Sequence, residues 1–307
     1  MTLVLAILGQ AAWAGDDVTP QTPDYPTGKF QSYEKDSGVL VNGDAVSKTV
    51  YEHTVQVNNA AWLRIYLGDV QLGQGSFVRF TSLLDGEVQE LDADGLAMWE
   101  NSSAYFNGDA VTVELVAGAA TALNRIKIEM VARTIIDEAQ LGCGFPCGIC
   151  GPDDRVPSSV NFASRLLPAG CTATLYTSTS CLVSAGHCIF GSMVIQFNVP
   201  PSNSNCSTNN PPVADQFPIL TVDFINNGIG DDWSVMTSGT NNLGETAFQR
   251  YGERLPISDV PVATGDPLTV WGYGIDSECT RSQVQQISLG FVTSVDSTFF
   301  NHDVDIT

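Results

Sequence analysis

Positively charged residues are scarce in this chain. Among its 307 residues, 13 Lys and Arg stand against 34 Asp and Glu, which gives a formal net charge of −21. Nucleic acids and anionic membranes carry negative charge themselves and would repel such a surface. We therefore expect neither nucleic acid nor membrane as a partner.

Other features are missing as well. No segment is long and apolar enough to span a bilayer as a helix, and no Asp-x-Asp-x-Asp-Gly loop suggests a calcium site. Charge-rich helical heptads are absent, whereas Gly, Thr, Ser, Val and Asn are plentiful. With 43% hydrophobic and 15% charged residues, the composition indicates a globular, all-β protein long enough for two domains.

The first residues resemble a secretion signal in their pattern. A short apolar run at 2–9 is followed by Ala12-Trp13-Ala14, which suits cleavage after Ala14. We expect residues 1–14 to be a signal peptide and the protein to be secreted to the extracellular space; a buried N-terminal strand is the alternative. Eight cysteines agree with an oxidising compartment. Residues 15–28, rich in Pro, Asp and Thr, are interpreted as a linker.

Residues 29–135 show the alternation typical of half-buried strands. The apolar positions are Leu63, Ile65, Leu67; Val111, Val113, Leu115; and Ile126, Ile128, Met130. Turn signals at 84–86, 94–95 and 107–109 separate the runs. We predict a β-sandwich domain that resembles the jelly-roll modules preceding protease domains in some secreted bacterial proteins. Trp62, Trp99, Tyr105 and Phe106 are either core residues or a sugar-stacking surface.

Residues 136–152 form a predicted hinge rich in Cys and Gly. Cys143, Cys147 and Cys150 lie in it, but no fourth soft ligand or His is near, so disulfides are favoured over a metal site. The sequence does not choose among the possible pairings of these cysteines with Cys181, Cys206 and Cys279.

The most informative segment is 171–188. Two short apolar runs flank a polar turn, and His187 precedes Cys188 at the end of the second run. A disulfide from Cys171 to Cys188 would clamp this hairpin and fix the backbone of His187, as a catalytic base requires. Residues 182–188 read Leu-Val-Ser-Ala-Gly-His-Cys. They resemble the histidine motif of trypsin-like serine proteases, and the alternative is a core histidine beside a structural cystine.

Two further segments support this resemblance. Residues 230–236 read Gly-Asp-Asp-Trp-Ser-Val-Met and are similar to the family's aspartate motif, which implies Asp232 as the triad acid, with Asp231 as the alternative register. Asp215 and Asp223 lack a comparable motif. Residues 270–274, Val-Trp-Gly-Tyr-Gly, resemble a Gly-Trp-Gly turn of the second barrel. The segment Asp153-Asp154-Arg155 resembles the start of glutamyl-endopeptidase-like (V8-like) enzymes, whereas the basic activation site before Ile-Val-Gly-Gly is absent.

The resemblance implies a chymotrypsin-like double β-barrel at 153–307, with its first barrel complete from about Val156 to Thr240 and its second barrel incomplete. Neither the Gly-Asn/Asp-Ser-Gly motif of the nucleophile nor a Gly-x-Ser-x-Gly motif occurs in the chain. We expect the serine shortly beyond Thr307 and the sequence to be a fragment of a longer protein; a native end at Thr307 is the alternative.

The resemblance implies a secreted serine endopeptidase acting on proteins or peptides through His187 and Asp232, with no cofactor and no metal. One alternative is a non-catalytic, protease-like protein whose sandwich binds a glycan or a protein. Another is that the first region is a propeptide released by cleavage in the hinge.

Overall fold

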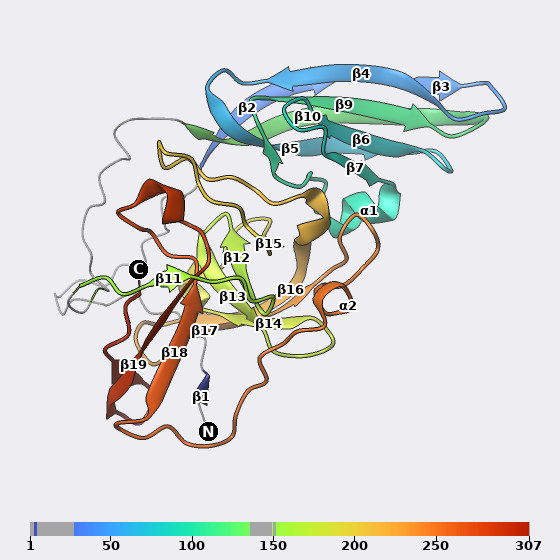
Figure 1. Ribbon diagram of the computed structural model, residues 1–307. Helices are drawn as coiled ribbons and strands as arrows, with labels where there is room; N and C mark the ends of the chain where they lie inside the picture. The colour runs from blue at the N-terminus through green and yellow to red at the C-terminus, as the bar shows by residue number, and fades with distance from the viewer. Residues whose placement is uncertain (1–2, 5–27, 136–148, 150–151, 307) are drawn as a thin grey trace.

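The computed structural model describes residues 3–4, 28–135, 149 and 152–306. Strands dominate these residues, and the α-helices among them are the short α1 (Ala93–Met98) and α2 (Ala247–Tyr251). The predicted all-β class is confirmed. Figure 1 shows a sandwich at the top, a barrel below it and an open sheet at the lower left. No helix in the described ranges is long and apolar enough to cross a membrane.

The sandwich consists of two antiparallel sheets. One has the order β2-β10-β5-β8, with β3 also paired to β10. Its strands are β2 (Lys29–Asp36), β3 (Leu40–Asn42), β5 (Ala60–Gln71), β8 (Phe106–Asn107) and β10 (Thr121–Ile135). The other has the order β4-β9-β6-β7, formed by β4 (Lys48–Gln56), β6 (Phe77–Ser82), β7 (Val88–Leu91) and β9 (Ala110–Ala117).

Most of the predicted apolar positions face the sandwich core, but two local predictions are wrong. A register shift between Ile128 and Met130 leaves Met130 half-buried and turns Val131 inward instead. The predicted turn at 94–95 lies inside α1, where the side chain of Asp92 accepts a hydrogen bond from the Gly95 N–H and caps the helix. Trp62, Trp99, Tyr105 and Phe106 are at most 2% exposed, so these four aromatic residues form core and not a sugar-stacking surface.

The barrel closes with six antiparallel strands in the order β12-β13-β14-β17-β16-β15. These are β12 (Ala163–Leu167), β13 (Cys171–Leu175), β14 (Cys181–Ser184), β15 (Val194–Gln196), β16 (Gln216–Asn226) and β17 (Asp232–Ser238). The prediction of a complete first barrel is therefore confirmed, but its start at Val156 is wrong. Val156 lies in β11 (Val156–Pro157), which pairs with β19 (Gln286–Val295) outside the barrel.

The remaining strands form an open sheet among the described residues. Its order is β1-β18-β19-β11, with β20 also paired to β19. The strands are β1 (Leu3–Val4), β18 (Pro267–Gly272), β19 (Gln286–Val295) and β20 (Phe300–His302). Only β1 pairs in parallel, with Leu268 and Thr269. The rest of the predicted signal peptide, most of the linker and nearly all of the Cys/Gly-rich hinge lie outside the described residues, so these predictions stay predictions.

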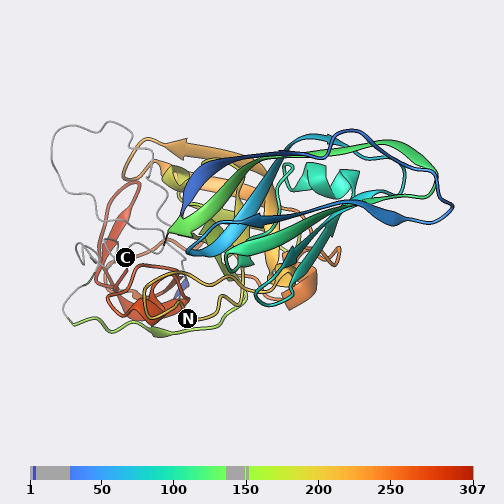
Figure 2. The ribbon, with the colours of Figure 1, turned by 90° about the horizontal axis from the view of Figure 1, so that it is seen from above.

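The apolar core of the sandwich extends into the barrel region, and the barrel also has a core cluster of its own. Leu167, Val194 and Val213 belong to the barrel region, yet they are buried in the same cluster as the sandwich residues. Figure 2 shows the sandwich extending from one side of the rest of the molecule. The join between the two parts is thus a packed interface.

Candidate active site

A disulfide-clamped hairpin carries His187. Cys171 at the start of β13 is bonded to Cys188, with their Cα atoms 6.2 Å apart, which confirms the predicted pair. Strands β13 and β14 pair through Thr174–Val183 and Leu175–Leu182, and a 3₁₀ turn at Gly186–Cys188 follows. The disulfide therefore ties this turn back to the start of β13. The backbone of His187 is fixed by β14 before it and by the disulfide of Cys188 after it.

Asp232 contacts His187 twice. Its Oδ2 lies 2.5 Å from His187 Nδ1, and its Oδ1 accepts the backbone N–H of His187 at 2.9 Å. The carboxylate thus fixes both the ring and the backbone of the histidine. With Nδ1 facing Asp232, Nε2 is the nitrogen left to exchange a proton with another group. The side chains of His187 and Asp232 are 31% and 21% exposed, so the pair is open to a ligand.

Gly186 allows this approach. A Cβ built on Gly186 would lie 1.8 Å from the carbonyl oxygen of Ile225 and 3.0 Å from Oδ1 of Asp232. Real Cβ atoms do not come so close to a backbone atom. The glycine before the histidine is therefore required by the packing of the turn against β16 and Asp232.

The other aspartates lie in different surroundings. Asp231, the alternative register, is exposed and bonds within its own turn to Asn227 and Gly228. Asp215 accepts hydrogen bonds from Arg250 and from the hydroxyl of Tyr251. Burial, and to a smaller extent this bond to Asp215, raise the pKa of Tyr251. Asp223 is exposed on β16. Among these candidates, Asp232 is the one that the structure brings to His187.

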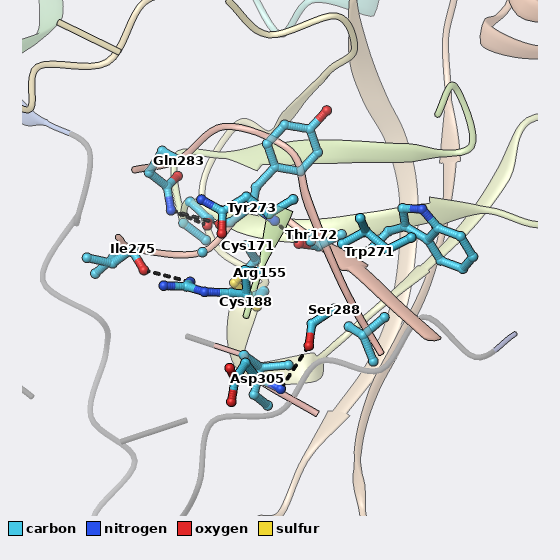
Figure 3. A pocket seen from close by; sticks show the side chains of 18 of the residues that line it. Arg155, Cys171, Thr172, Cys188, Trp271, Tyr273, Ile275, Gln283, Ser288 and Asp305 are labelled. Carbon is cyan, nitrogen blue, oxygen red and sulfur yellow. Dashed lines mark hydrogen bonds between the residues drawn. A yellow bond between two sulfur atoms is a disulfide. The ribbon is translucent and has the colours of Figure 1, made fainter. Parts of the chain in front are cut away.

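A cleft of about 150 Å³ opens beside His187. Residues from the barrel line one side of it, and residues from the open sheet and its neighbouring segments line the other. Figure 3 shows Thr172 and Cys188 of the barrel side and Trp271, Tyr273, Gln283 and Ser288 of the other side among the lining residues. The two sides meet where Thr172 Oγ1 accepts the backbone N–H of Tyr273 at 2.9 Å. The segment 270–274, identified by its resemblance to the Gly-Trp-Gly turn, therefore forms a wall of the cleft that contains His187.

Arg155 of the Asp-Asp-Arg segment also lines this cleft. Arg155 is 7% exposed and donates to both carboxylate oxygens of Asp153 and to the carbonyl of Ile275. Burial opposes its charge, but the hydrogen-bonded carboxylate of Asp153 and the nearby charges of Asp276 and Asp305 outweigh burial and raise the pKa of Arg155. The same bonds from Arg155 lower the pKa of Asp153. The Asp-Asp-Arg segment is thus an anchor of the chain on the open sheet.

No hydroxyl bonds to His187 within the described residues. Ser288 lines the same cleft but is 3% exposed, and its Oγ donates to Asp154 Oδ1. It also accepts the backbone N–H of Asp305 at 3.2 Å. Ser288 is therefore engaged in the anchor of the 153–155 segment and does not serve as a partner for the imidazole.

A metal could draw on few ligands at this site. Ligand atoms of Cys171, His187 and Cys188 lie within 4.8 Å of one another. Both sulfurs are consumed by their disulfide, which leaves the imidazole alone, whereas a zinc site needs three or four ligands. Cys206 is bonded to Cys279, and Cys181 is a free thiol. The three hinge cysteines lie outside the described residues.

No protein-family model matches the chain, and no curated protein matches its sequence. Among solved structures, it is similar to the crystal structure of a thermostable serine protease, AL20, from an extremophilic microorganism, with a TM-score of 0.34 and 16% identity. That match covers 42% of this chain and 63% of the other, less than two thirds of its length. A likeness of this degree carries no argument about the reaction.

Proposed function

We propose that the protein is a secreted serine endopeptidase in which His187 is the general base and Asp232 orients it. The observation that carries the proposal is the double contact of the Asp232 carboxylate with the ring and the backbone N–H of His187. A carboxylate in this place holds the imidazole in one tautomer and stabilises the imidazolium that forms when the base takes a proton. Proteins or peptides are the proposed substrates.

The nucleophile in this proposal is a serine outside the described residues. It would approach His187 Nε2 from the cleft, lose its proton to that nitrogen and attack the carbonyl carbon of the scissile bond. His187 would then return the proton to the leaving amine, and water would hydrolyse the acyl-enzyme by the same route. Secretion is supported by the two disulfides, since such bonds persist in oxidising compartments.

A second candidate is a non-catalytic protein that keeps the protease-like fold. The observation in its favour is that no hydroxyl bonds to His187 among the described residues. In that case the hydrogen bond between His187 and Asp232 would be structural, and binding of a protein or glycan would take place elsewhere. Sequencing the gene past the codon for Thr307 separates the two candidates. A frame encoding Gly-Asn-Ser-Gly or a close variant supports the endopeptidase, and a stop codon supports the binding protein.

The chemical test is labelling by a fluorophosphonate, which reacts with activated serines, of the protein secreted from its complete gene. His187→Ala and Asp232→Asn are expected to slow labelling by a factor on the order of 10³ to 10⁴. Asp231→Asn is the matched control, because it removes a neighbouring carboxylate that contacts only its own turn. Absence of labelling in the unmodified protein, or equal labelling in all variants, would refute the proposal.

A further inference from the structure

The sandwich is joined to the barrel by buried amides. Gln216 begins β16 and is fully buried. Its Nε2 donates to the carbonyls of Tyr105 and Pro211, and its Oε1 accepts the backbone N–H of Tyr105 and an Nε2–H of Gln196. The opposite orientation of the amide would set its oxygen against two carbonyls. Gln216 is therefore held in one orientation by the backbone of the sandwich.

Arg165 continues this connection through the barrel. It lies on β12, is fully buried and donates from Nε and Nη2 to Oε1 of Gln196, at 3.1 and 2.6 Å. Its remaining partners are Asn210 Oδ1 and the carbonyls of Asn209 and Gln283. None of these partners is a carboxylate, and burial lowers the pKa of Arg165 to about 10. A buried cation that depends on neutral acceptors is sensitive to the position of each one.

Gln283 ends this series of hydrogen bonds and belongs to the cleft wall. Its backbone is in the left-handed region, with φ at 58°, which is unfavourable for a residue with a side chain. Its carbonyl accepts from Arg165 Nη1 at 3.1 Å. Its Nε2 donates to the carbonyls of Gly170 and Tyr273, and its backbone N–H donates to Gly274. Gln283 thus holds together two segments that line the cleft with His187, as Figure 3 shows for its bond to Tyr273.

A second contact enters the same network from the sandwich. Asn107 accepts the backbone N–H of Asn210 at 2.8 Å and donates to its carbonyl at 3.0 Å. The side chain of Asn210 accepts from both Arg165 and Gln196. The sandwich therefore reaches Arg165 by two routes.

We propose that the β-sandwich is permanently coupled to the wall of the cleft, although none of its described residues lines the cleft, and that Arg165 is a positioning residue through which sandwich contacts at Gln216 and Asn210 hold that wall at Gln283. The positioning role rests on the proposed function, but the mechanical connection does not. A sandwich that acts in this way is neither a propeptide to be discarded nor a binding module on a flexible tether. Loss of its contacts would loosen the wall beside His187 without touching His187 itself.

The test compares two glutamines in the full chain by amide hydrogen exchange. Gln216→Leu removes the amide that connects the sandwich with the barrel. Gln89→Leu is the matched control, because Gln89 is equally buried but bonds to the backbone N–H of Ala104 within the sandwich. Urea unfolding measures the free energy of unfolding of each variant. Exchange rates are then compared under conditions in which the two variants have the same free energy of unfolding. At equal stability, we expect exchange in residues 272–285 to rise about tenfold in Gln216→Leu and to change less than about twofold in Gln89→Leu.

Two further pairs of variants test the same connection. If Gln216→Leu does not fold, the same comparison is made with Asn107→Ala, at a half-buried position, against Asn42→Ala. Asn42 ends β3, and its side chain donates to the carbonyls of Ala117 and Gly118 within the sandwich. Arg165→Lys, which retains a donor for the Gln283 carbonyl, should restore most of the protection lost in Arg165→Met. Equal exchange of the wall in the connecting and control variants overturns the proposal. Amide exchange is measured without a substrate. A protein that is not labelled by the fluorophosphonate can therefore still show the expected exchange, and a labelled protein can fail to show it.

Discussion

Gly186 is the residue on which the geometry of the His187 turn depends most directly. Replacing it with alanine would drive a methyl group into the carbonyl of Ile225 and against Asp232. We expect Gly186→Ala to destabilise the protein by about 1–3 kcal/mol, as overpacking of a closed site does. It should also separate His187 from Asp232. Urea unfolding and the NMR signal of the His187 Nδ1 proton measure the two effects.

Gly43→Ala is the control for this change, since a Cβ at Gly43 meets nothing within 4 Å. An equal effect of the two substitutions would contradict the steric explanation.

The site residues that could be predicted from the sequence are those in short local motifs, namely His187 and Asp232. Gln283 could not be assigned, because its partner Arg165 lies far away in the chain and the side chain itself carries no distinctive pattern. The Asp153-Asp154-Arg155 motif was visible in the sequence, but the bond of Arg155 to the distant carbonyl of Ile275 was not.

At the scale of elements, the two disulfides differ in what they join. Cys171–Cys188 closes a hairpin within the barrel over a separation of 17 residues. Cys206–Cys279 spans 73 residues and ties the loop after β15 to the segment after β18. Because the loss of unfolded-chain entropy grows with loop length, the paired change Cys206→Ser/Cys279→Ser should cost roughly 4 kcal/mol and Cys171→Ser/Cys188→Ser about 3 kcal/mol.

Denaturant unfolding of the two double variants measures this order. Cys181→Ser serves as the control, because Cys181 is a free thiol and its removal should change stability by less than about 0.5 kcal/mol. A larger loss from the shorter loop would show that loop entropy does not set the contribution of these bonds.

Strands were the elements most readily predicted, because alternation such as that of Val111, Val113 and Leu115 in β9 follows directly from one buried face. The bulge that displaces Met130 in β10 leaves no such signal, since it changes the phase of the strand without changing its composition. Arg64 alternates with Leu63 and Ile65 as a solvent-facing residue would, yet it is fully buried. The second face of its sheet is covered by the barrel, a tertiary contact that the period of a single strand does not encode.

At the scale of the whole molecule, the sequence suggested two bodies joined by a hinge, whereas the fold joins them through packing. Leu167, Val194 and Val213 continue the sandwich core into the barrel. Trp62 donates from its indole N–H to Thr208, and Glu87 accepts the backbone N–H of Val213. Contacts between residues more than a hundred positions apart require both surfaces to be known, so a composition shift at 136–152 could not reveal them. We therefore expect the sandwich and the barrel to unfold together.

Arg64 gives the sharpest test of this expectation. It is fully buried in the sandwich and donates from Nη1 to the carbonyl of Ser192 at 2.7 Å and from Nη2 to its hydroxyl at 2.9 Å. Arg64→Met would leave buried acceptors on both sides without donors, at a cost of about 3 kcal/mol. It should also split a single unfolding transition, followed by tryptophan fluorescence in urea, into two. Arg79→Met is the control, because Arg79 forms partly exposed ion pairs with Glu90 and Glu114 that contribute less than about 1 kcal/mol. Two transitions in the unmodified protein would mean that the shared core does not couple the two parts, and the sandwich could then act as a separable module.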